Sequence, residues 1–482
     1  MTARITPRRL PSPDSRIVSP DRLMPADPAA RAIARRLYDG VATLPIISPH
    51  GHTDPRWYAE DLPFADPARL FVVPDHYVFR MLYSQGVPLE ALGIAAKDGT
   101  PVETDPRKIW RLFAANYHLF RATPTRLWLD HAFAALFGLD ERLSAANADA
   151  TYDLIAAALA EPAYRPRALY KTFDIEVIAT TEGALDDLTW HARIAGSDWD
   201  GRVITTYRPD AVVDPDFEGF RANLGKLGEM TGEDTATWTG YLAAHRKRRA
   251  FFKSHGATAS DHGHPTARTA DLGPVEVERL FQRIVSGEAG PEEADLFRGQ
   301  MLTEMARMSL DDGLVLQIHP GSRRNHNARV FGRFGRDMGA DIPGPTDYVT
   351  ALKPLLDAFG NEPKLTIILF TLDETAYSRE LSPLAGHYPA LRLGPPWWFY
   401  DSVDGMKRFK DQVIETAGFY NTVGFNDDTR AFPSIPARHD VARRVDCAHL
   451  AELVVAGRLG ADEAEELAGD LAYGLAKKAY RL

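Results

Sequence analysis

Eight short runs of apolar and β-branched residues, each ending in polar residues, constrain the fold of this chain more than any other feature. Helix-like sequence follows most of them. Apolar runs of this length without strict alternation are typical of parallel strands buried on both faces, and helices between them indicate repeated βα units. Because eight such units close a barrel, the sequence predicts an α/β fold, a (β/α)8 TIM barrel. The runs are 46–49, 176–181, 203–207, 257–261, 314–319, 365–371, 391–394 and 422–427.

The connection between the first two runs is far longer than a βα unit needs. It holds segments whose apolar residues recur every three to four positions, the pattern of amphipathic helices. We therefore expect a helical insertion after the first strand, on the face where barrels carry their pockets. The predicted division is a loose N-terminal arm at 1–25, a barrel with helical decorations at 26–103 and 166–482, and the insertion at 104–165.

Composition excludes several classes of protein and partner. The 482 residues carry 56 Lys and Arg against 66 Asp and Glu, a net charge of −10, which argues against a nucleic acid or an anionic membrane as partner. No apolar stretch approaches the roughly 20 residues that a membrane span needs. The start, MTARITPRRLPSPDSR, lacks the apolar centre of a secretory leader, and the single cysteine excludes a disulfide framework. We expect a cytoplasmic protein that acts on a small molecule; whether it forms a homo-oligomer stays open.

Polar side chains at the ends of the runs predict the place of the chemistry, because barrel active sites lie at the carboxyl ends of the strands. His50 and His52 follow the first run, and residues two apart in an extended chain point to the same side. Alone, such a pair of histidines can simply be two exposed residues at the end of a strand. Together with Asp428 at the eighth run and His319 at the fifth, it forms a ligand set suited to Zn²⁺ or a similar ion.

The order of several sequence blocks resembles the uronate isomerase (glucuronate isomerase) family of the amidohydrolase superfamily. The blocks are ARRLYDGVATLPIISPHGHTDP, DHYVFRMLYSQG, VIATTEGALDDLTWH, VITTYRPD, ASDHG, LQIHPGSRRNHN, PPWWFYDSVDGMKRF and VGFNDDTRAF. The resemblance implies an amidohydrolase-type barrel. It implies aldose–ketose isomerisation of D-glucuronate to D-fructuronate and of D-galacturonate to D-tagaturonate.

The same resemblance implies roles for individual residues. It implies one divalent metal, with Zn²⁺ the expected ion and no strict requirement for it, and no organic cofactor. The metal ligands would be His50, His52 and Asp428. The catalytic residues would be Asp428, Arg430, Tyr77 and His52. The sugar acid would contact His76, Tyr77, His319, Arg324, Trp397 and Arg430.

Two features depart from the family pattern. Ser48 stands where the family usually has an acidic residue. A second H-x-H, His262 and His264, has no known role there, and the part played by Asp261 beside it is equally open.

The chemistry of an isomerase fits these residue types. Moving a proton between adjacent carbons through an enediol needs a base, a group that stabilises the charged oxygen, and a cation for the carboxylate. The planar forks of Arg324 and Arg430 suit carboxylate or oxyanion groups. Tyr77, whose phenol has an ordinary pKa of about 10, would need a nearby cation to transfer a proton. Whether Asp428 would act as a metal ligand, as a base or as both stays open.

Two other functions compete with isomerisation. The first is a mononuclear metal-dependent hydrolase or deaminase of the amidohydrolase type. It is weakened because the fourth run ends in Ala-Ser-Asp and the sixth continues to Leu-Asp, without the lysine and histidine of a second metal. The second is a catalytically silent protein that binds sugar acids on the same fold.

Overall fold

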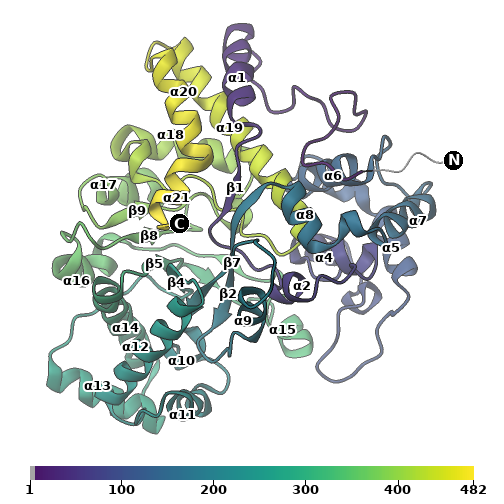
Figure 1. Cartoon of the computed structure of the whole chain (residues 1–482). Helices are drawn as coiled ribbons and strands as arrows, with labels where there is room; N and C mark the ends of the chain where they lie inside the picture. The colour runs from purple at the N-terminus through teal and green to yellow at the C-terminus, as the bar shows by residue number, and fades with distance from the viewer. Residues whose placement is uncertain (1–5) are drawn as a thin grey trace. The chain divides into compact units, whose positions relative to one another are not determined.

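The computed structural model describes residues 6–482 (Figure 1). The chain divides into two units that are each assembled from three stretches of sequence. The first five residues of the predicted arm at 1–25 lie outside the described part. Unit 1 comprises Met1–Glu176, Arg323–Ile342 and Asp427–Tyr473, and unit 2 comprises Val177–Ser322, Pro343–Asn426 and Gly474–Leu482. The predicted division at 1–25, 26–103, 104–165 and 166–482 stays a prediction.

A parallel sheet of seven strands organises the fold, with the strands ordered as they occur in the chain. The paired strands from β2 onward run parallel, and their positions are largely buried. The prediction of a parallel α/β fold is therefore confirmed, and seven of the eight predicted runs overlap a strand. The strands are β1 (Ile46–Ser48), β2 (Ile175–Gly183), β3 (Val203–Arg208), β4 (Ala259–His262), β5 (Val315–Ile318), β8 (Ile367–Leu369) and β9 (Leu391–Leu393).

The eighth predicted run, 422–427, pairs without forming a regular strand. Thr422 makes an isolated parallel bridge with Leu393, and the Val423 N–H donates to the Leu393 carbonyl at 3.1 Å. Gly424 then has a φ of 73°, which interrupts the extended conformation. The closed eight-stranded barrel stays a prediction. A separate two-stranded sheet is formed by β6 (Ser322–Arg323) and β7 (Ile342–Pro343).

Many helices of unit 1 begin at an acidic residue or threonine followed by proline. The side chain before the proline accepts a backbone N–H of the first turn, as Asp27 does from Ala30, and proline fits the first helical position. The helices that begin this way are α1 (Pro28–Val41), α2 (Pro55–Glu60), α3 (Pro67–Phe71), α5 (Pro106–Ala115) and α6 (Pro124–Phe137). The others are α4 (His76–Ser84), α7 (Ala148–Leu159), α8 (Pro166–Thr172), α15 (Ala328–Phe334), α19 (Ile435–Val455) and α20 (Ala461–Gly469).

The core of unit 2 joins its strands to the surrounding helices. Leu316 and Ile318 of β5 belong to one buried cluster with Phe297 and Met301 of α14 and Leu355 of α16. No helix in the described range 6–482 is long and apolar enough to span a bilayer. The helices of unit 2 are α9 (Thr189–Ala195), α10 (Asp210–Val213), α11 (Phe220–Thr231), α12 (Trp238–Ser254), α13 (Pro274–Ser286), α14 (Pro291–Asp312), α16 (Val349–Phe359), α17 (Ser382–Ala385), α18 (Val403–Ala417) and α21 (Leu475–Ala479).

Candidate metal and substrate site

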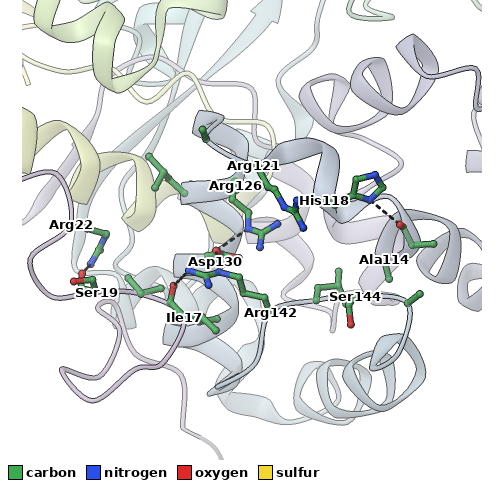
Figure 2. A pocket seen from close by; sticks show the side chains of 16 residues that line it. Ile17, Ser19, Arg22, Ala114, His118, Arg121, Arg126, Asp130, Arg142 and Ser144 are labelled. Carbon is green, nitrogen blue, oxygen red and sulfur yellow. Dashed lines mark hydrogen bonds and ion pairs between the residues drawn. The ribbon is translucent and has the colours of Figure 1, made fainter.

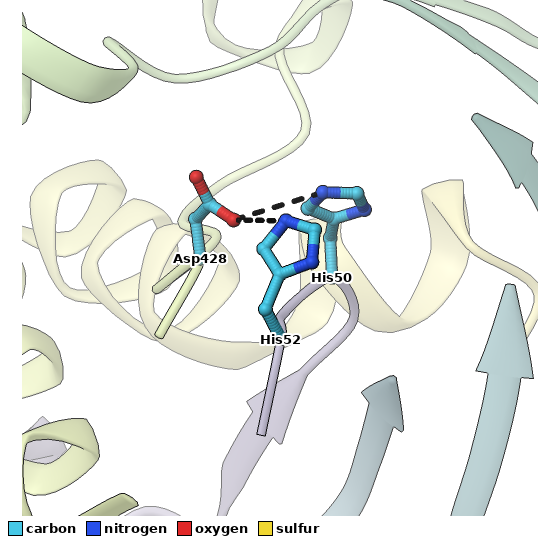
Figure 3. Close-up of side chains that lie close together, drawn as sticks. All are labelled: His50, His52 and Asp428. Atoms are coloured by element: carbon cyan, nitrogen blue, oxygen red, sulfur yellow. Dashed lines mark ion pairs between the residues drawn. The ribbon is translucent and has the colours of Figure 1, made fainter. Parts of the chain in front are cut away.

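Two imidazoles and a carboxylate meet in unit 1, as Figure 3 shows. His50 Nε2 lies 3.7 Å and His52 Nε2 lies 3.2 Å from Oδ1 of Asp428. Each of the three side chains offers one ligand atom, and these atoms lie within 4.8 Å of one another. Residues separated by most of the chain length therefore converge on one point.

Backbone hydrogen bonds fix this convergence. The Asp428 N–H donates to the His50 carbonyl at 3.2 Å, and the His52 N–H donates to the Thr429 carbonyl at 2.9 Å. Asp428 has a φ of 43°, a left-handed conformation that aspartate tolerates better than most residues. That turn ends the extended segment and is the local reason why the carboxylate stands beside both histidines.

The three side chains fit a divalent cation. Two ligands about 2.1 Å from a tetrahedral ion are separated by about 3.4 Å, and the observed separations of 3.2 and 3.7 Å bracket that value. His50 Nδ1 is buried and has no hydrogen-bond partner among residues 6–482. Two nitrogen donors and one oxygen donor are a set that suits Zn²⁺ and similar ions.

The electrostatics of the cluster keep both kinds of ligand in the form that binds a cation. Burial lowers the pKa of His52, opposed by its hydrogen bond to Asp428, so the imidazole is neutral at pH 7. Burial would raise the pKa of Asp428, but the hydrogen bond from His52 and the nearby charges lower it below the usual value. Neutral imidazole and ionised carboxylate are the metal-binding forms.

His76 and Tyr77 lie together in unit 1 at the start of α4. Asp75 caps this helix by accepting the Tyr77 N–H at 2.8 Å, and the His76 and Tyr77 rings are 4.9 Å apart. Burial lowers the pKa of His76 well below its usual value, and the charge of Arg430 acts in the same direction. His76 is therefore a neutral imidazole that can donate or accept one hydrogen bond.

Arg438 on α19 contacts the same groups, and sequence reasoning missed it. Its guanidinium lies 5.3 Å from the centre of the Tyr77 ring and 3.8 Å from that of Trp128. Its Nη1 donates to the Asp427 carbonyl at 2.7 Å, and the side chain is buried. No spacing in the sequence singles this arginine out, because its role depends on how α19 packs.

Asp427, the neighbour of Asp428, also binds α19. Its Oδ2 lies 3.1 Å from Nε2 of His439, and both side chains are buried. Burial raises the pKa of Asp427, but the bond to His439 and its charge outweigh that effect and lower it. No sequence pattern singled out His439, so this support for the cluster was also missed.

The two predicted arginines differ in how firmly they are held. Arg430 Nη2 lies 3.8 Å from Oδ1 of Asp337, whose side chain is 54% exposed. Arg324 Nη1 donates to Oδ2 of Asp341 at 2.9 Å, and that carboxylate is buried. Arg430 also acts on the pKa of His52, which places its charge close to the cluster.

His319 and Trp397 belong to unit 2, where their rings are 4.9 Å apart. His319 Nε2 lies 2.8 Å from Oδ1 of Asp261, and Arg208 Nη1 lies 3.5 Å from Oδ2 of the same carboxylate. Asp261 thus has a histidine and an arginine as partners.

The second H-x-H has a different geometry from the first. The rings of His262 and His264 are 5.8 Å apart, and in the described part of the chain they belong to no group of three possible metal ligands. Burial lowers the pKa of His264 to about 4 and that of His262 well below its usual value. The pair is therefore two neutral, buried imidazoles.

Comparison with known proteins decides the family. A sequence model of the family described as Glucuronate isomerase matches residues 28–480. The chain belongs to the glucuronate isomerase family. A uronate isomerase of Rhizobium meliloti (strain 1021) is 67% identical over 97% of this chain and 99% of its own length.

Solved structures of this family agree with the fold described above. The crystal structure of glucuronate isomerase from Caulobacter crescentus matches with a TM-score of 0.95 and 61% identity, covering 96% of this chain and 97% of that one. That of uronate isomerase from Thermotoga maritima matches with a TM-score of 0.89 and 28% identity, covering 96% and 99%. Membership of the glucuronate isomerase family, predicted from the sequence blocks, is confirmed.

Proposed function

We propose that this chain is a uronate isomerase that interconverts D-glucuronate with D-fructuronate and D-galacturonate with D-tagaturonate. One observation carries the proposal. In a chain of this family, His50, His52 and Asp428 form a cluster whose ligand atoms fit a cation, and the charge of Arg430 lowers the pKa of His52. The cluster supplies a site for substrate oxygens, and the arginine supplies positive charge for an anionic transition state.

The reaction moves one proton between adjacent carbons without net oxidation. A base removes the proton from C2 of the open-chain aldose. The C–H electron pair becomes the C1–C2 double bond, and the π pair of the C1 carbonyl moves onto its oxygen, which gives an enediolate. A proton then bonds to C1, and the proton of the C2 hydroxyl passes to the oxygen on C1, which leaves a carbonyl at C2. No redox cofactor enters this balance.

The residues of unit 1 would have separate roles in this reaction. Arg430 would stabilise the oxygen that gains negative charge, because a guanidinium donates two hydrogen bonds in one plane. Tyr77, beside the cation of Arg438, would give or take a proton. Asp428 would orient the substrate through its second oxygen or act as a base. His76 would hold a hydroxyl with its neutral ring.

A divalent ion, which we propose to be Zn²⁺, would be held by His50, His52 and Asp428 and would act as a Lewis acid toward a substrate oxygen. Arg324 would bind the substrate carboxylate, and His319 and Trp397 are proposed as further substrate contacts. No organic cofactor is proposed. We also propose a cytoplasmic location.

We propose that the fold is the complete (β/α)8 barrel, with 104–165 as its helical insertion. The segment 422–429 supports this, because its beginning pairs with Leu393 of β9 and Thr429, at its end, accepts the N–H of His52 beyond β1. A segment that pairs with the last strand at one end and next to the first strand at the other is what closure requires.

The test is a ¹H NMR time course with the purified chain, with and without added Zn²⁺. D-glucuronate and D-galacturonate are tested in separate reactions. Ketose should form from at least one of them, Asp428→Asn should abolish most of the activity, and Asp39→Asn, a change at an exposed carboxylate of α1, should leave it unchanged. Absence of ketose from both substrates under both conditions would end the proposal.

A further inference from the structure

Unit 1 contains a pocket that has no part in the proposed isomerase site. It has a volume of about 720 Å³ and is lined by the segment around Ile17, by the ends of α5 and α6, and by residues 142–145 (Figure 2). None of the residues proposed for metal, substrate or catalysis lines it. Whatever binds here can therefore be studied apart from isomerase chemistry.

Positive charge dominates the pocket wall. Among the described residues that line it are four arginines and a single acidic residue, Asp130. Arg126 Nε and Arg142 Nε both donate to Oδ2 of Asp130, at 2.9 and 3.1 Å. Arg22 pairs with Asp440, which does not line the pocket. One carboxylate thus serves two guanidiniums, a local excess of positive charge in a chain whose net charge is −10.

Two of the guanidiniums are fixed in place by further contacts. Arg126 Nη1 donates to the Tyr117 carbonyl at 3.0 Å, and the guanidinium lies 4.1 Å from the centre of the Tyr117 ring. Arg142 Nη2 donates to the Ile17 carbonyl at 3.0 Å. Each arginine therefore keeps one Nη group with no partner within residues 6–482, and each is already oriented before a ligand binds, which lowers the entropy lost on binding.

Arg121 adds a third guanidinium. It is exposed, and in the described part of the chain its side chain makes no ion pair or hydrogen bond. The next residue, Ala122, also lines the pocket and has a φ of 63°. This conformation is unfavourable for alanine by about 1 kcal/mol, and such residues concentrate at ligand sites.

The rest of the wall is apolar. Ile17, Val18, Leu127 and Leu143 line the pocket beside the arginines. A ligand that matches both parts has an anionic group joined to a less polar body. A phosphate monoester offers three oxygens, one for each of the three guanidiniums, and a charge of about −1.5 to −2, whereas a carboxylate offers two oxygens and a single charge.

We propose that this pocket binds a small organic phosphate monoester, with its phosphate held by Arg121, Arg126 and Arg142 and its body against the apolar wall. The site takes a class of ligand different from the uronate substrates, which carry a carboxylate.

Isothermal titration calorimetry on the full chain tests the proposal with glucose 6-phosphate, inorganic phosphate and uncharged glucose. Glucose 6-phosphate should bind and glucose should not. Arg121→Ala should weaken the binding at least about tenfold, the loss of one charge-assisted contact of about 1.4 kcal/mol or more. Arg279→Ala, at an exposed arginine of α13, should leave it unchanged. Because Arg121 is exposed, its variant should retain the circular dichroism of the parent.

The possible results of the titrations distinguish a phosphate site from no site. Inorganic phosphate binding that Arg121→Ala also weakens supports the anion site and assigns its affinity to the phosphate group. Arg142→Ala should also weaken the binding of both glucose 6-phosphate and inorganic phosphate. Failure of both phosphates to bind the parent chain, or binding that neither arginine change affects, would overturn the proposal.

Discussion

Replacing Arg430 by methionine should slow the reaction far more than it weakens substrate binding. Within residues 6–482 of the free enzyme, the guanidinium makes one long ion pair, 3.8 Å from the half-exposed carboxylate of Asp337. Exposed pairs of this kind contribute about 0–1 kcal/mol to stability. The charge of Arg430 is therefore almost fully available to the substrate, and its loss should hardly affect folding.

The magnitude follows from the hydrogen bonds that the guanidinium can make. Two charge-assisted hydrogen bonds to an oxygen that becomes negative contribute about 1.5 kcal/mol or more each. Losing about 3 kcal/mol of transition-state stabilisation corresponds to a fall in kcat of roughly 150-fold. Arg324→Met should behave differently, because Arg324 is held by Asp341 at 2.9 Å and is proposed to bind the carboxylate equally in ground and transition states. It should chiefly raise KM.

Initial rates over a range of D-glucuronate concentrations, followed by NMR, separate kcat from KM for both variants. Thermal unfolding serves as the control for folding, and Arg430→Met should melt within a few degrees of the parent. An Arg430→Met enzyme with normal kcat and a raised KM would refute the assignment of this arginine to the developing charge.

The remaining predictions concern the proton path, the metal, a supporting arginine and the pH dependence of stability. Tyr77→Phe should lower kcat at least about tenfold, and a near-normal rate would remove the phenol from the proton path. His50→Asn should weaken zinc binding, measured by equilibrium dialysis without substrate; unchanged affinity would contradict the proposed ligand set. Arg438→Met should destabilise the fold by about 2–4 kcal/mol in urea unfolding, because it removes the charged hydrogen bond to the Asp427 carbonyl, which within the described residues keeps only the Thr429 hydroxyl at 3.3 Å, and the contact with Tyr77. A stability within 0.5 kcal/mol of the parent (about the scatter of surface changes) would count against that support. Burial lowers the pKa of His245 to about 3, so between pH 6.5 and 3 the unfolded chain takes up a proton that the folded chain does not. As the pH falls through this range, the free energy of unfolding therefore decreases by up to about 1.4 kcal/mol per pH unit. His245→Gln should flatten the slope of unfolding free energy against pH between pH 6 and 4.5, and an unchanged slope would show that this histidine is not held neutral.

The strands were predictable because burial on both faces selects apolar residues. Run 314–319 contains β5, and all four positions of that strand are buried. Gln317 is the polar exception, and its Oε1 accepts the Tyr480 hydroxyl at 2.9 Å. That partner lies at the far end of the chain, so no local pattern could have indicated it.

The eighth run shows where sequence patterns stop being informative. Its composition resembles that of a strand, but Gly424 and Asp428 both adopt a positive φ. A β-branched run with a single glycine does not reveal whether that glycine stays extended or turns the chain. The turn at Asp428 is what presents the carboxylate to His52, so the departure from a regular strand serves the site.

The site was only partly predictable for a similar reason. His50, His52 and Asp428 could be singled out because residues at the ends of parallel strands gather at one edge of a sheet. Arg438 could not, since it reaches Tyr77 from a helix whose packing the sequence does not specify. His439, which binds Asp427 from the same helix, was missed for the same reason.

Solvent isotope incorporation tests the central claim of proton transfer most directly. The purified chain is incubated in D₂O with D-glucuronate, and the product and the recovered substrate are analysed by NMR and mass spectrometry. Because protein groups that exchange with solvent carry the proton, deuterium should enter C1 of the ketose and, through the reverse reaction, C2 of the aldose. Conversion to ketose with no deuterium at either carbon would contradict the account.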